Sequence, residues 1–392
     1  MPETFRALRA LWFKLDPEYS QRITLAVLGA LGKTHPFDQY LAEYFRGKLP
    51  LCPARVMGID FPNPVGLAAG LDKNARAVDG LGALGFGFLE LGTVTPLPQT
   101  GNPKKRLFRF INEEALINRM GFNNAGLNEF LKNLSGHRSH VRIGISIGKN
   151  SDVPVEEAIR DYRTCLRAVY TVTDYVAVDI SSPNTTGLFE LQAEPLFSRI
   201  LQQLKDEQAQ LAQQHGLYTP IAIKLSPDLN REEIQRIANT LMAFELDGVI
   251  ATNTTRLRPG VIAGTRLASE DGGLSGRPLL KPSTEIVRQL YQHLRGSLPI
   301  IGCGGIFDPE DAWSKLCAGA SLVQLYTGFA YHGPALVRRI VEDLAGRAAD
   351  SGTGELAAIL AAVHARIATP NPHQEIISSN ARGKSSAPHR NY

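Results

Sequence analysis

The sequence has few cysteines, little net charge and no long apolar run, and each shortage excludes a class of protein. The four cysteines are scattered among 392 residues, without a C-x-x-C pair or a histidine cluster, so neither structural zinc nor a disulfide framework is expected. A net charge of +4 is small for this length and does not suggest a nucleic-acid partner. No apolar run reaches the roughly 18 residues that span a bilayer, and the first ten residues do not resemble a signal peptide.

What remains is an ordinary globular composition, 43% hydrophobic and 20% charged, with room for one large α/β domain and an appendage. The first fifty residues predict short helices. The first helix has an apolar stripe flanked by arginine and lysine, formed by Phe5, Leu8, Leu11, Trp12 and Leu15. Two more are expected from Asp16 to Gly32 and from Pro36 to Phe45. This segment is either a small helical cap or a monotopic membrane segment, and the pattern favours neither.

From residue 64 onwards, apolar strand-like runs alternate with helix-like stretches, after a short predicted hairpin at residues 55–61. The eight runs are Pro64–Ala68, Phe88–Gly92, Val141–Ile147, Tyr175–Ile180, Ile221–Leu225, Gly248–Ala251, Pro299–Gly302 and Leu322–Tyr326. Eight such units over about 280 residues predict an α/β fold of the (β/α)8 TIM-barrel type with an N-terminal helical extension. A doubly wound sheet is the competing architecture, but eight units fit a closed barrel better.

Two further stretches depart from this rhythm. Residues 95–140 form an insert that is long for a loop inside a compact domain, which predicts a functional segment. Residues 355–367 predict one more alanine-rich helix, and residues 369–392 a disordered tail. The chain is therefore divided into residues 1–50, a barrel at residues 51–348 and an extension at residues 349–392.

Each predicted strand ends in polar residues or glycine, and the carboxyl ends of barrel strands surround one pocket. The loop Asp179–Leu188 alone could be a polar turn that caps the next helix. Glycine-rich turns after strands seven and eight, however, are typical of a barrel phosphate site. Lys73 and Lys224 would add two cations to the pocket, and a cation beside the pyrimidine edge of a flavin stabilises its reduced, anionic form.

Seven motifs in order resemble dihydroorotate dehydrogenase, and specifically its quinone-reducing class 2 branch. They are Ala69-Gly-Leu-Asp-Lys73, Gly92-Thr-Val-Thr-Pro96, Asn118-Arg-Met-Gly-Phe-Asn-Asn124, Ser181-Ser-Pro-Asn-Thr185, Ala251-Thr-Asn-Thr-Thr255, Gly272-Gly-Leu-Ser-Gly-Arg-Pro278 and Gly302-Cys-Gly-Gly305. The resemblance covers about residues 1–345. It implies oxidation of dihydroorotate to orotate in UMP biosynthesis, with FMN as hydride acceptor and a membrane quinone as final acceptor.

The resemblance also implies roles for particular residues. One FMN per chain would be bound by Ala69, Gly70, Leu71, Asp72, Lys73, Thr93, Ser146, Asp179, Lys224, Thr252, Gly276, Gly305, Tyr326 and Thr327. Dihydroorotate would be bound by Lys73, Asn118, Arg119, Met120, Gly121, Phe122, Asp179, Asn184, Asn253 and Thr254. Ser182 corresponds to the catalytic base, and Thr185 and Phe122 to the proton exit.

The same resemblance implies a quinone tunnel at Gln21 and Arg109, between the N-terminal helices. Those helices would hold the protein on the cytoplasmic face of a bacterial inner membrane, as a peripheral membrane protein. Neither a metal nor a nucleic acid is expected as a partner.

Three residues depart from the family pattern. Ser146 and Asp179 stand where the family has asparagine, and Gln21 stands where class 2 members often have histidine. A carboxylate at position 179 cannot donate a hydrogen bond unless it is protonated. Two alternatives therefore stay open: a membrane-associated flavin-binding barrel with impaired turnover, and another FMN-dependent barrel oxidoreductase. The second is disfavoured, because the motifs at residues 118–124 and 181–185 occur together.

Overall fold

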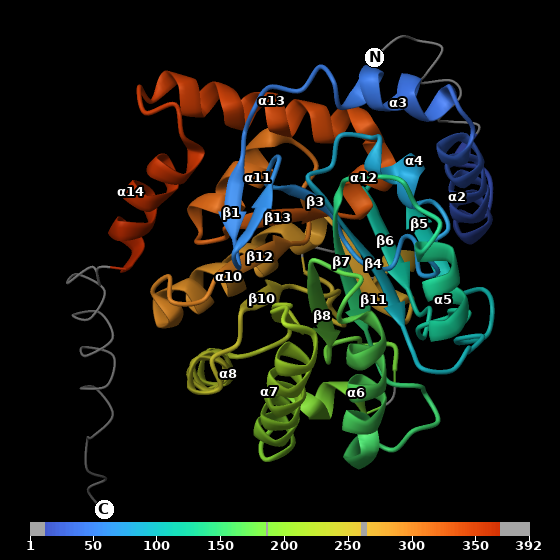
Figure 1. Cartoon of the computed structure of the whole chain (residues 1–392), viewed down its shortest axis with the longest axis vertical. Helices are drawn as coiled ribbons and strands as arrows, with labels where there is room; N and C mark the ends of the chain where they lie inside the picture. Colours follow the sequence, from blue (N-terminus) through green and yellow to red (C-terminus); the bar gives the residue numbers. More distant parts are fainter. Residues whose placement is uncertain (1–11, 186, 260–264, 369–392) are drawn as a thin grey trace, which may run out of the picture.

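A computed structural model describes residues 12–185, 187–259 and 265–368 (Figure 1). Eight parallel strands form a closed barrel, in which the last strand pairs with the first through Val323 and Val65. All eight predicted runs form barrel strands, and the predicted (β/α)8 architecture is confirmed. The strands are β3 (Val65–Leu67), β4 (Phe88–Val94), β7 (Arg142–Ile147), β8 (Tyr175–Asp179), β9 (Ile221–Leu225), β10 (Gly248–Ala251), β12 (Ile300–Cys303) and β13 (Leu322–Leu325).

The interior of the barrel is layered, because alternate residues of each strand point inwards. Its lower layer is apolar and contains Phe88 and Tyr175, which are fully buried. Gly66 and Gly144 make room for these rings, since a Cβ atom on either glycine would lie within 2.2 Å of a ring carbon. The predicted hairpin, β1 (Ala54–Val56) and β2 (Ile59–Phe61), closes this end by packing Phe61 against Phe88.

Helices surround the barrel strands and bury their apolar faces against them. Those that follow barrel strands are α4 (Val78–Gly82), α6 (Ala158–Val169), α7 (Leu196–His215), α8 (Arg231–Ala243), α10 (Leu280–Leu294), α11 (Pro309–Cys317), α12 (Thr327–His332) and α13 (Pro334–Asp350). Helix α8 shows how local sequence sets a boundary. The Asn230 side chain accepts from the Glu233 N–H, and the Glu233 carboxylate accepts from the Asn230 N–H, which satisfies two free donors at the helix start.

The insert at residues 95–140 contains more regular structure than the single functional loop that the sequence suggested. It contributes β5 (Leu107–Phe110), β6 (Ala115–Asn118) and α5 (Leu127–Leu134). The two strands form an antiparallel sheet with β11 (Gly273–Gly276), a segment far along the chain. Each strand has only four residues, so the period-2 pattern is too short to detect, and the third strand comes from another loop.

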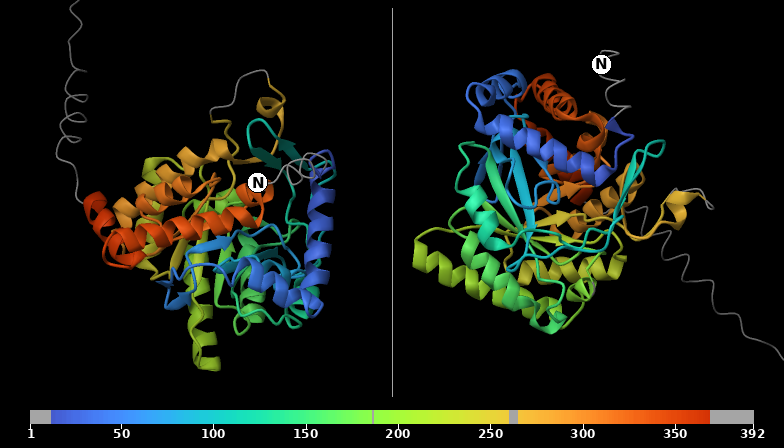
Figure 2. Two further views of the ribbon diagram at one scale, coloured as in Figure 1. Left: turned by 90° about the horizontal axis from the view of Figure 1, so that it is seen from above. Right: turned by 90° about the vertical axis from the view of Figure 1, so that its right-hand side faces the viewer.

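The N-terminal helices lie along one side of the barrel, and the last described helix lies on the opposite side (Figures 1 and 2). Helix α2 (Pro17–Lys33) begins at Asp16, whose carboxylate accepts two backbone N–H groups, and α3 (Phe37–Phe45) follows. Helix α2 packs directly on α4, because Gly32 and Gly80 let the two backbones meet: a Cβ on Gly32 would lie 2.4 Å from the Gly80 nitrogen. Most of the first predicted helix lies outside the described residues.

The extension contains α14 (Leu356–Ala368), as expected for residues 355–367. This helix is docked, since Leu356 and Leu360 are buried and a His364 ring nitrogen lies 2.7 Å from the Leu316 carbonyl oxygen. The predicted disordered tail, residues 369–392, lies outside the described residues. Among the described helices, none is long and apolar enough to cross a membrane. The three-part division of the chain remains a prediction.

Candidate active site

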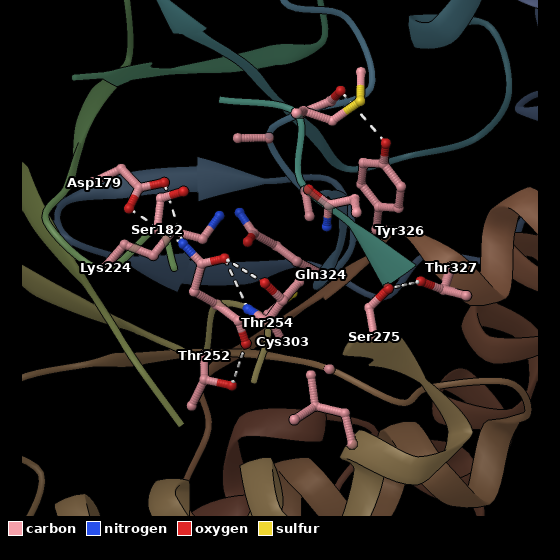
Figure 3. Close-up of a pocket in the computed structure, with 18 of the residues that line it drawn as sticks. Asp179, Ser182, Lys224, Thr252, Thr254, Ser275, Cys303, Gln324, Tyr326 and Thr327 are labelled. Carbon is pink, nitrogen blue, oxygen red and sulfur yellow. Dashed lines mark hydrogen bonds between the residues drawn. The ribbon is translucent and has the colours of Figure 1, made fainter. Parts of the chain in front are cut away.

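The carboxyl ends of the barrel strands and the loops above them enclose one pocket (Figure 3). Its walls combine glycine and apolar residues with polar side chains from the ends of several barrel strands. Asp179, Lys224, Thr252, Cys303 and Gln324 belong to the strand ends themselves, while Ser182, Asn184 and Thr254 come from the loops. The pocket therefore lies where (β/α)8 enzymes carry out chemistry.

Glycine residues line the pocket beside the carboxyl end of strand β12. Gly276, Gly304 and Gly305 have φ values of 100°, 113° and 78°, which other residues rarely adopt. A Cβ atom on Gly305 would lie 2.3 Å from Cα of Leu280, so a side chain does not fit there. Beside them, the Thr327 hydroxyl donates to Ser275 Oγ at 2.8 Å. Exposed backbone with neighbouring hydroxyls is the type of surface that binds a phosphate group.

A buried ionic network supports the floor of the pocket. The Glu90 carboxylate is fully buried in strand β4 and accepts from Lys224 Nζ at 3.2 Å, from the Tyr175 hydroxyl at 3.0 Å and from Gln324 Nε2 at 2.6 Å. Burial acts to lower the pKa of Lys224, but the Glu90 carboxylate outweighs it and the pKa is raised. Lys224 is thus a permanent cation at the pocket.

Asp179 ends strand β8 next to Lys224, with which it is in register. Its Oδ1 atom accepts from the Ser181 N–H and the Ser181 hydroxyl, both at 3.0 Å, and from Asn253 Nδ2 at 3.2 Å. Burial raises the pKa of the Asp179 carboxyl, against the opposing effect of the Lys224 cation. Because a carboxylate only accepts, it holds the Asn253 amide with its nitrogen towards Asp179 and its oxygen towards the Thr254 N–H, 2.8 Å away.

Amides from three segments converge on the upper part of the pocket. Asn184 Nδ2 donates to Asn118 Oδ1 at 3.0 Å, which joins the loop after β8 to the end of β6. Ser182 is 7% exposed, and its Oγ atom accepts a weak hydrogen bond from the Asn184 N–H at 3.4 Å. Such amides offer donors and acceptors in one plane, which suits a flat ring with alternating N–H and C=O groups.

A second, apolar cavity of about 900 Å³ adjoins the pocket and runs between α2, α3 and the barrel. Tyr326 lines both spaces, and burial raises the pKa of its hydroxyl to about 12. The polar residues of this cavity are anchored at its walls. Gln21 Nε2 donates to the Leu71 carbonyl at 2.8 Å, and Arg109 donates to the Phe13 carbonyl at 3.0 Å. The cavity is thus a predominantly apolar channel that ends at the pocket.

A model of the dihydroorotate dehydrogenase family matches residues 52–347. This chain belongs to the dihydroorotate dehydrogenase family. A protein of Burkholderia cenocepacia named dihydroorotate dehydrogenase (quinone) is 51% identical over 337 residues, which cover 86% of this chain and 96% of that protein. One of Paraburkholderia phymatum with the same name is 51% identical over 342 residues, covering 87% and 98%. The crystal structure of DHODH from Eimeria tenella in complex with ferulenol has a TM-score of 0.73 and 36% identity, covering 81% of this chain and 92% of that one.

Family membership implies a flavin, and most residues that the resemblance assigned to flavin and dihydroorotate do line the pocket. These are Ala69, Gly70, Lys73, Thr93, Asn118, Met120, Gly121, Phe122, Asp179, Ser182, Asn184, Lys224, Thr252, Asn253, Thr254, Gly276, Gly305, Tyr326 and Thr327. Their individual roles remain predictions. Gln21 and Arg109 line the apolar cavity instead, as expected for a separate channel.

Five assigned residues lie behind the pocket wall or beside it. Ser146 is fully buried, and its hydroxyl oxygen lies 2.9 Å from that of Thr93, which itself lines the pocket. The Asp72 carboxylate accepts the N–H groups of Arg76 and Ala77 and so supports the turn after β3. Leu71 lines the apolar cavity.

The remaining two assigned residues outside the pocket are Arg119 and Thr185. The Arg119 guanidinium forms an ion pair with Glu270 at 2.6 Å and donates a hydrogen bond to the Asp271 carbonyl oxygen. Its side chain therefore does not line the pocket. Thr185 is buried, and its hydroxyl has no hydrogen-bond partner among the described residues.

Sequence reasoning missed Glu90 and Gln324, and it quoted Ser275, Cys303 and Gly304 within motifs without giving them individual roles. Glu90 had a detectable signal, because it is the single charge in the apolar run Phe88–Gly92 and a carboxylate inside a barrel strand needs a partner. Gln324 has a similar position in the last strand. Its Oε1 atom is buried with no partner among the described residues, which leaves one acceptor at the pocket wall.

Proposed function

We propose that this protein oxidises dihydroorotate to orotate in pyrimidine biosynthesis and passes the electrons to a membrane quinone. The observation that carries the proposal is the junction at Tyr326, where a polar pocket with amides and two cations meets an apolar channel. A polar, anionic substrate and an apolar quinone need such different environments. No metal is required, and no cluster of metal ligands occurs among the described residues.

The flavin of this family is proposed to be FMN, one per chain. The residues fit that group. Gly276, Gly304 and Gly305 would present positive-φ backbone to a phosphate, with the Thr327 and Ser275 hydroxyls beside it. Lys224, held by Glu90, would provide a fixed positive charge for the pyrimidine edge of the ring. When bound, FMN accepts a hydride and later gives up two electrons.

The chain's own residues would bind and orient dihydroorotate above this site. Asn118, Asn184 and Asn253 would hydrogen-bond the ring, and Lys73 would bind the carboxylate. Lys73 Nζ is held by the Gly70 carbonyl at 2.8 Å, and burial, together with the nearby Arg106, lowers its pKa to about 8. It is therefore mainly protonated at neutral pH and able to bind an anion.

Ser182 is proposed to remove the proton from carbon 5 of the substrate. A free serine is a weak base, so its position and a proton outlet matter. The Asn184 N–H stabilises charge that develops on Ser182 Oγ, although at 3.4 Å this bond is weak until substrate binds. The unpartnered Thr185 hydroxyl and the Phe122 ring would form the outlet.

The apolar cavity is proposed to be the quinone channel, in which Gln21 and Arg109 are polar lining residues. Helix α3 presents three aromatic side chains to solvent, Phe37, Tyr40 and Tyr44, whose exposed fractions are 52%, 63% and 48%. Aromatic side chains at this density favour contact with the surface of a bilayer. We therefore propose peripheral attachment to the cytoplasmic face of the inner membrane.

Anaerobic mixing of the yellow protein with dihydroorotate tests the first half of the proposal, because prompt bleaching reports transfer of a hydride to flavin. Steady-state turnover with a short-chain quinone, compared with fumarate and NAD, tests the second half. We expect bleaching and a preference for quinone. A yellow protein that never bleaches would contradict the proposal and would support a flavin-binding barrel without efficient turnover.

A further inference from the structure

A buried lysine lies directly behind the glycine-rich turn of the proposed phosphate site. Lys315 belongs to α11, the helix that follows strand β12, and its side chain is fully buried. It is not among the residues that line the pocket. Its aliphatic part packs against Gly302, since a Cβ atom on that glycine would lie 2.7 Å from Cγ and Cδ of Lys315. The first glycine of the motif Gly302-Cys-Gly-Gly305 thus makes room for this lysine.

The ammonium group of Lys315 is bound by neutral hydroxyls. Its Nζ atom donates to Ser283 Oγ at 2.7 Å and to Thr284 Oγ1 at 3.1 Å, both on α10. Within the described part of the chain Lys315 forms no ion pair, and Asp311 of the same helix is paired with Arg277 at 3.3 Å instead. Burying a cation without an anion beside it is costly, so a buried lysine in this setting calls for an anion from elsewhere.

The other titratable groups around α11 do not supply that anion. Burial raises the pKa of the Cys303 thiol on β12, so the thiol is uncharged at neutral pH. On α13, Arg347 forms an ion pair with the exposed Glu310, and the His364 ring of α14 contacts the backbone of α11. Burial accordingly lowers the pKa of Lys315 to about 7.

Ser283 joins the lysine to the glycine-rich turn. Its hydroxyl accepts from Lys315 and donates to the Gly304 carbonyl at 3.1 Å. In a planar trans peptide, the C=O group and the N–H group that follows it point in opposite directions. The Gly305 N–H therefore points away from Ser283, and both Gly304 and Gly305 line the pocket. The contact with Ser283 thus fixes this peptide in an orientation that leaves its donor for an anion in the pocket.

We propose that Lys315 is a positioning residue for the FMN phosphate, on which it acts without touching it. Through Ser283 it holds the peptide between Gly304 and Gly305, and its charge attracts the phosphate dianion from behind the turn. This inference rests on the proposed function, and within it on FMN as the cofactor. A lysine that only filled space would support folding but would not distinguish a phosphorylated flavin from one without a phosphate.

The first test measures the preference of the protein for the phosphate. The purified holoprotein is equilibrated with an equimolar mixture of FMN and riboflavin, which lacks the phosphate, and the flavins retained after gel filtration are quantified by chromatography. Lys315→Met should lower the preference for FMN about five- to fiftyfold at pH 7, because methionine fills the space without a charge. The binding of riboflavin alone should not change.

The matched control removes a second buried lysine. Lys149 is 1% exposed, donates to the Asn150 and Val153 carbonyls, and follows β7, which lies opposite β12 in the barrel. Lys149→Met should therefore keep the preference for FMN. If the two methionine variants have equal preferences, the proposal is wrong. It is also wrong if the unsubstituted protein retains FMN and riboflavin equally well.

A second variant removes the link and keeps the charge. Ser283→Ala should lower the preference for FMN about three- to tenfold, because the Gly304 carbonyl and the Lys315 ammonium both lose a partner. Ser314→Ala is its control, since Ser314 is exposed on α11 and its hydroxyl bonds only the Asp311 carbonyl. This pair answers the question even if Lys315→Met does not fold. An unchanged preference in Ser283→Ala would overturn the proposal.

The pH dependence of the same measurement gives a signature that a purely structural lysine would lack. A bound phosphate dianion favours the charged form of Lys315, so the pKa of this lysine should be higher with FMN bound than with riboflavin bound. As pH rises from about 7 to about 9, the preference of the unsubstituted protein for FMN should fall at least about fivefold. The phosphate itself is fully ionised in this range, since its second pKa is about 6.

Groups that act on the flavin ring, such as Lys73, affect FMN and riboflavin alike and leave the ratio unchanged. The profile of Lys315→Met should therefore be flat over the same range, and a profile parallel to that of the unsubstituted protein would overturn the proposal. Failure of the proposed function looks different: a protein that prefers FMN with this pH dependence, yet is not bleached by dihydroorotate, would overturn the proposed reaction and support the role of Lys315.

Discussion

Two cavities border helix α2: the apolar channel of about 900 Å³ and a groove of about 980 Å³ with an excess of cations, here called the basic groove. They share Gln21, Leu25 and Leu71 as lining residues but differ in charge. The apolar channel is lined by side chains such as Leu28, Phe45 and Phe329, and the basic groove by Arg22, Lys33 and Lys104. Both cavities reach the pocket at the barrel mouth, the first at Tyr326 and the second at Lys73.

The comparison shows how one helix can border two cavities that favour different molecules. A charged molecule would lose hydration in the apolar channel without gaining partners, and an apolar molecule would gain little in the basic groove. The predictions below separate the two sides, from the largest expected effect to the smallest.

The largest effect is expected from removing the proposed base, which should affect flavin reduction by dihydroorotate but not flavin reoxidation by quinone. Ser182→Ala should slow reduction of the flavin by dihydroorotate by about 10²- to 10⁴-fold, the usual contribution of a positioned base. Flavin content and reoxidation by quinone should not change, since Ser182 lines the polar pocket and not the channel. Stopped-flow absorbance measures both half-reactions, and normal reduction kinetics would reject Ser182 as the base.

The channel side should respond to a polar group placed in its wall. Leu28→Gln should lower kcat/KM for quinone about tenfold, because desolvating the amide costs about 1–3 kcal/mol. Reduction by dihydroorotate should be unaffected. Leu31→Gln is the matched control, as Leu31 belongs to the same helix but is not among the residues that line the channel. Equal quinone kinetics in the two variants would mean that quinone does not pass Leu28.

The polar side should respond to pH through Lys73. Burial lowers the pKa of this lysine to about 8, and only its protonated form attracts an anion, so orotate affinity should be full below that pH and fall above it. The protonated fraction drops from about nine-tenths at pH 7 to about one-tenth at pH 9, which predicts about tenfold weaker binding. Titration of the flavin absorbance measures this. Lys73→Met should bind weakly with a flat pH profile, and a sloping profile in that variant would assign the effect to another group.

The smallest effect is expected at Asp179. Its charge repels bound orotate by about 3 kcal/mol at 5–6 Å and an effective dielectric of 20, and Lys224 offsets part of that. Asparagine would remove the charge, and its oxygen can keep the bonds that Oδ1 accepts. Its amide nitrogen, in the place of Oδ2, would lose the 3.3 Å bond from Asn253 Nδ2, at a cost of about 1 kcal/mol. Asp179→Asn should therefore bind orotate about three- to tenfold more tightly at pH 8.

The sign of the pH dependence follows from the raised pKa of Asp179. As pH falls, the wild-type carboxyl becomes neutral before an ordinary aspartate would, so the advantage of Asp179→Asn should shrink towards pH 5.5. Equal affinities of the two proteins at pH 8 would show that Asp179 is already neutral or is screened from the substrate.

Much of the fold could be read from short patterns, because barrel strands are buried on both faces and appear as apolar runs. The sequence-based boundaries of β9 and β10, Ile221–Leu225 and Gly248–Ala251, agree with the structure. The small sheet of β5, β6 and β11 could not be read in this way. Its strands are four residues long, and β11 pairs with β6 across more than 150 residues, as Ser275 opposite Leu116 shows.

The candidate site was predictable where a motif and a strand end coincide, as at Thr93 and Thr252, and at Lys224 from the strand end alone. It was not predictable where the direction of a side chain depends on a distant partner. Arg119 lies inside a motif, yet its guanidinium turns outwards to Glu270, which is 151 residues away. Ser146 lies near the end of a strand, yet it does not line the pocket, and its hydroxyl is hydrogen-bonded to Thr93 of the neighbouring strand.

The sequence by itself determined the eight strands, their order and the family, because apolar periodicity and seven local motifs depend on neighbouring residues alone. The tertiary structure decided which side chains face each other. It brought Glu90, Lys224, Tyr175 and Gln324 from four strands into one buried network. It also set α2 against the barrel so that Leu28 and Arg22 of one helix line different cavities. These outcomes depend on closure of the barrel and docking of the helix, and no stretch of sequence contains either.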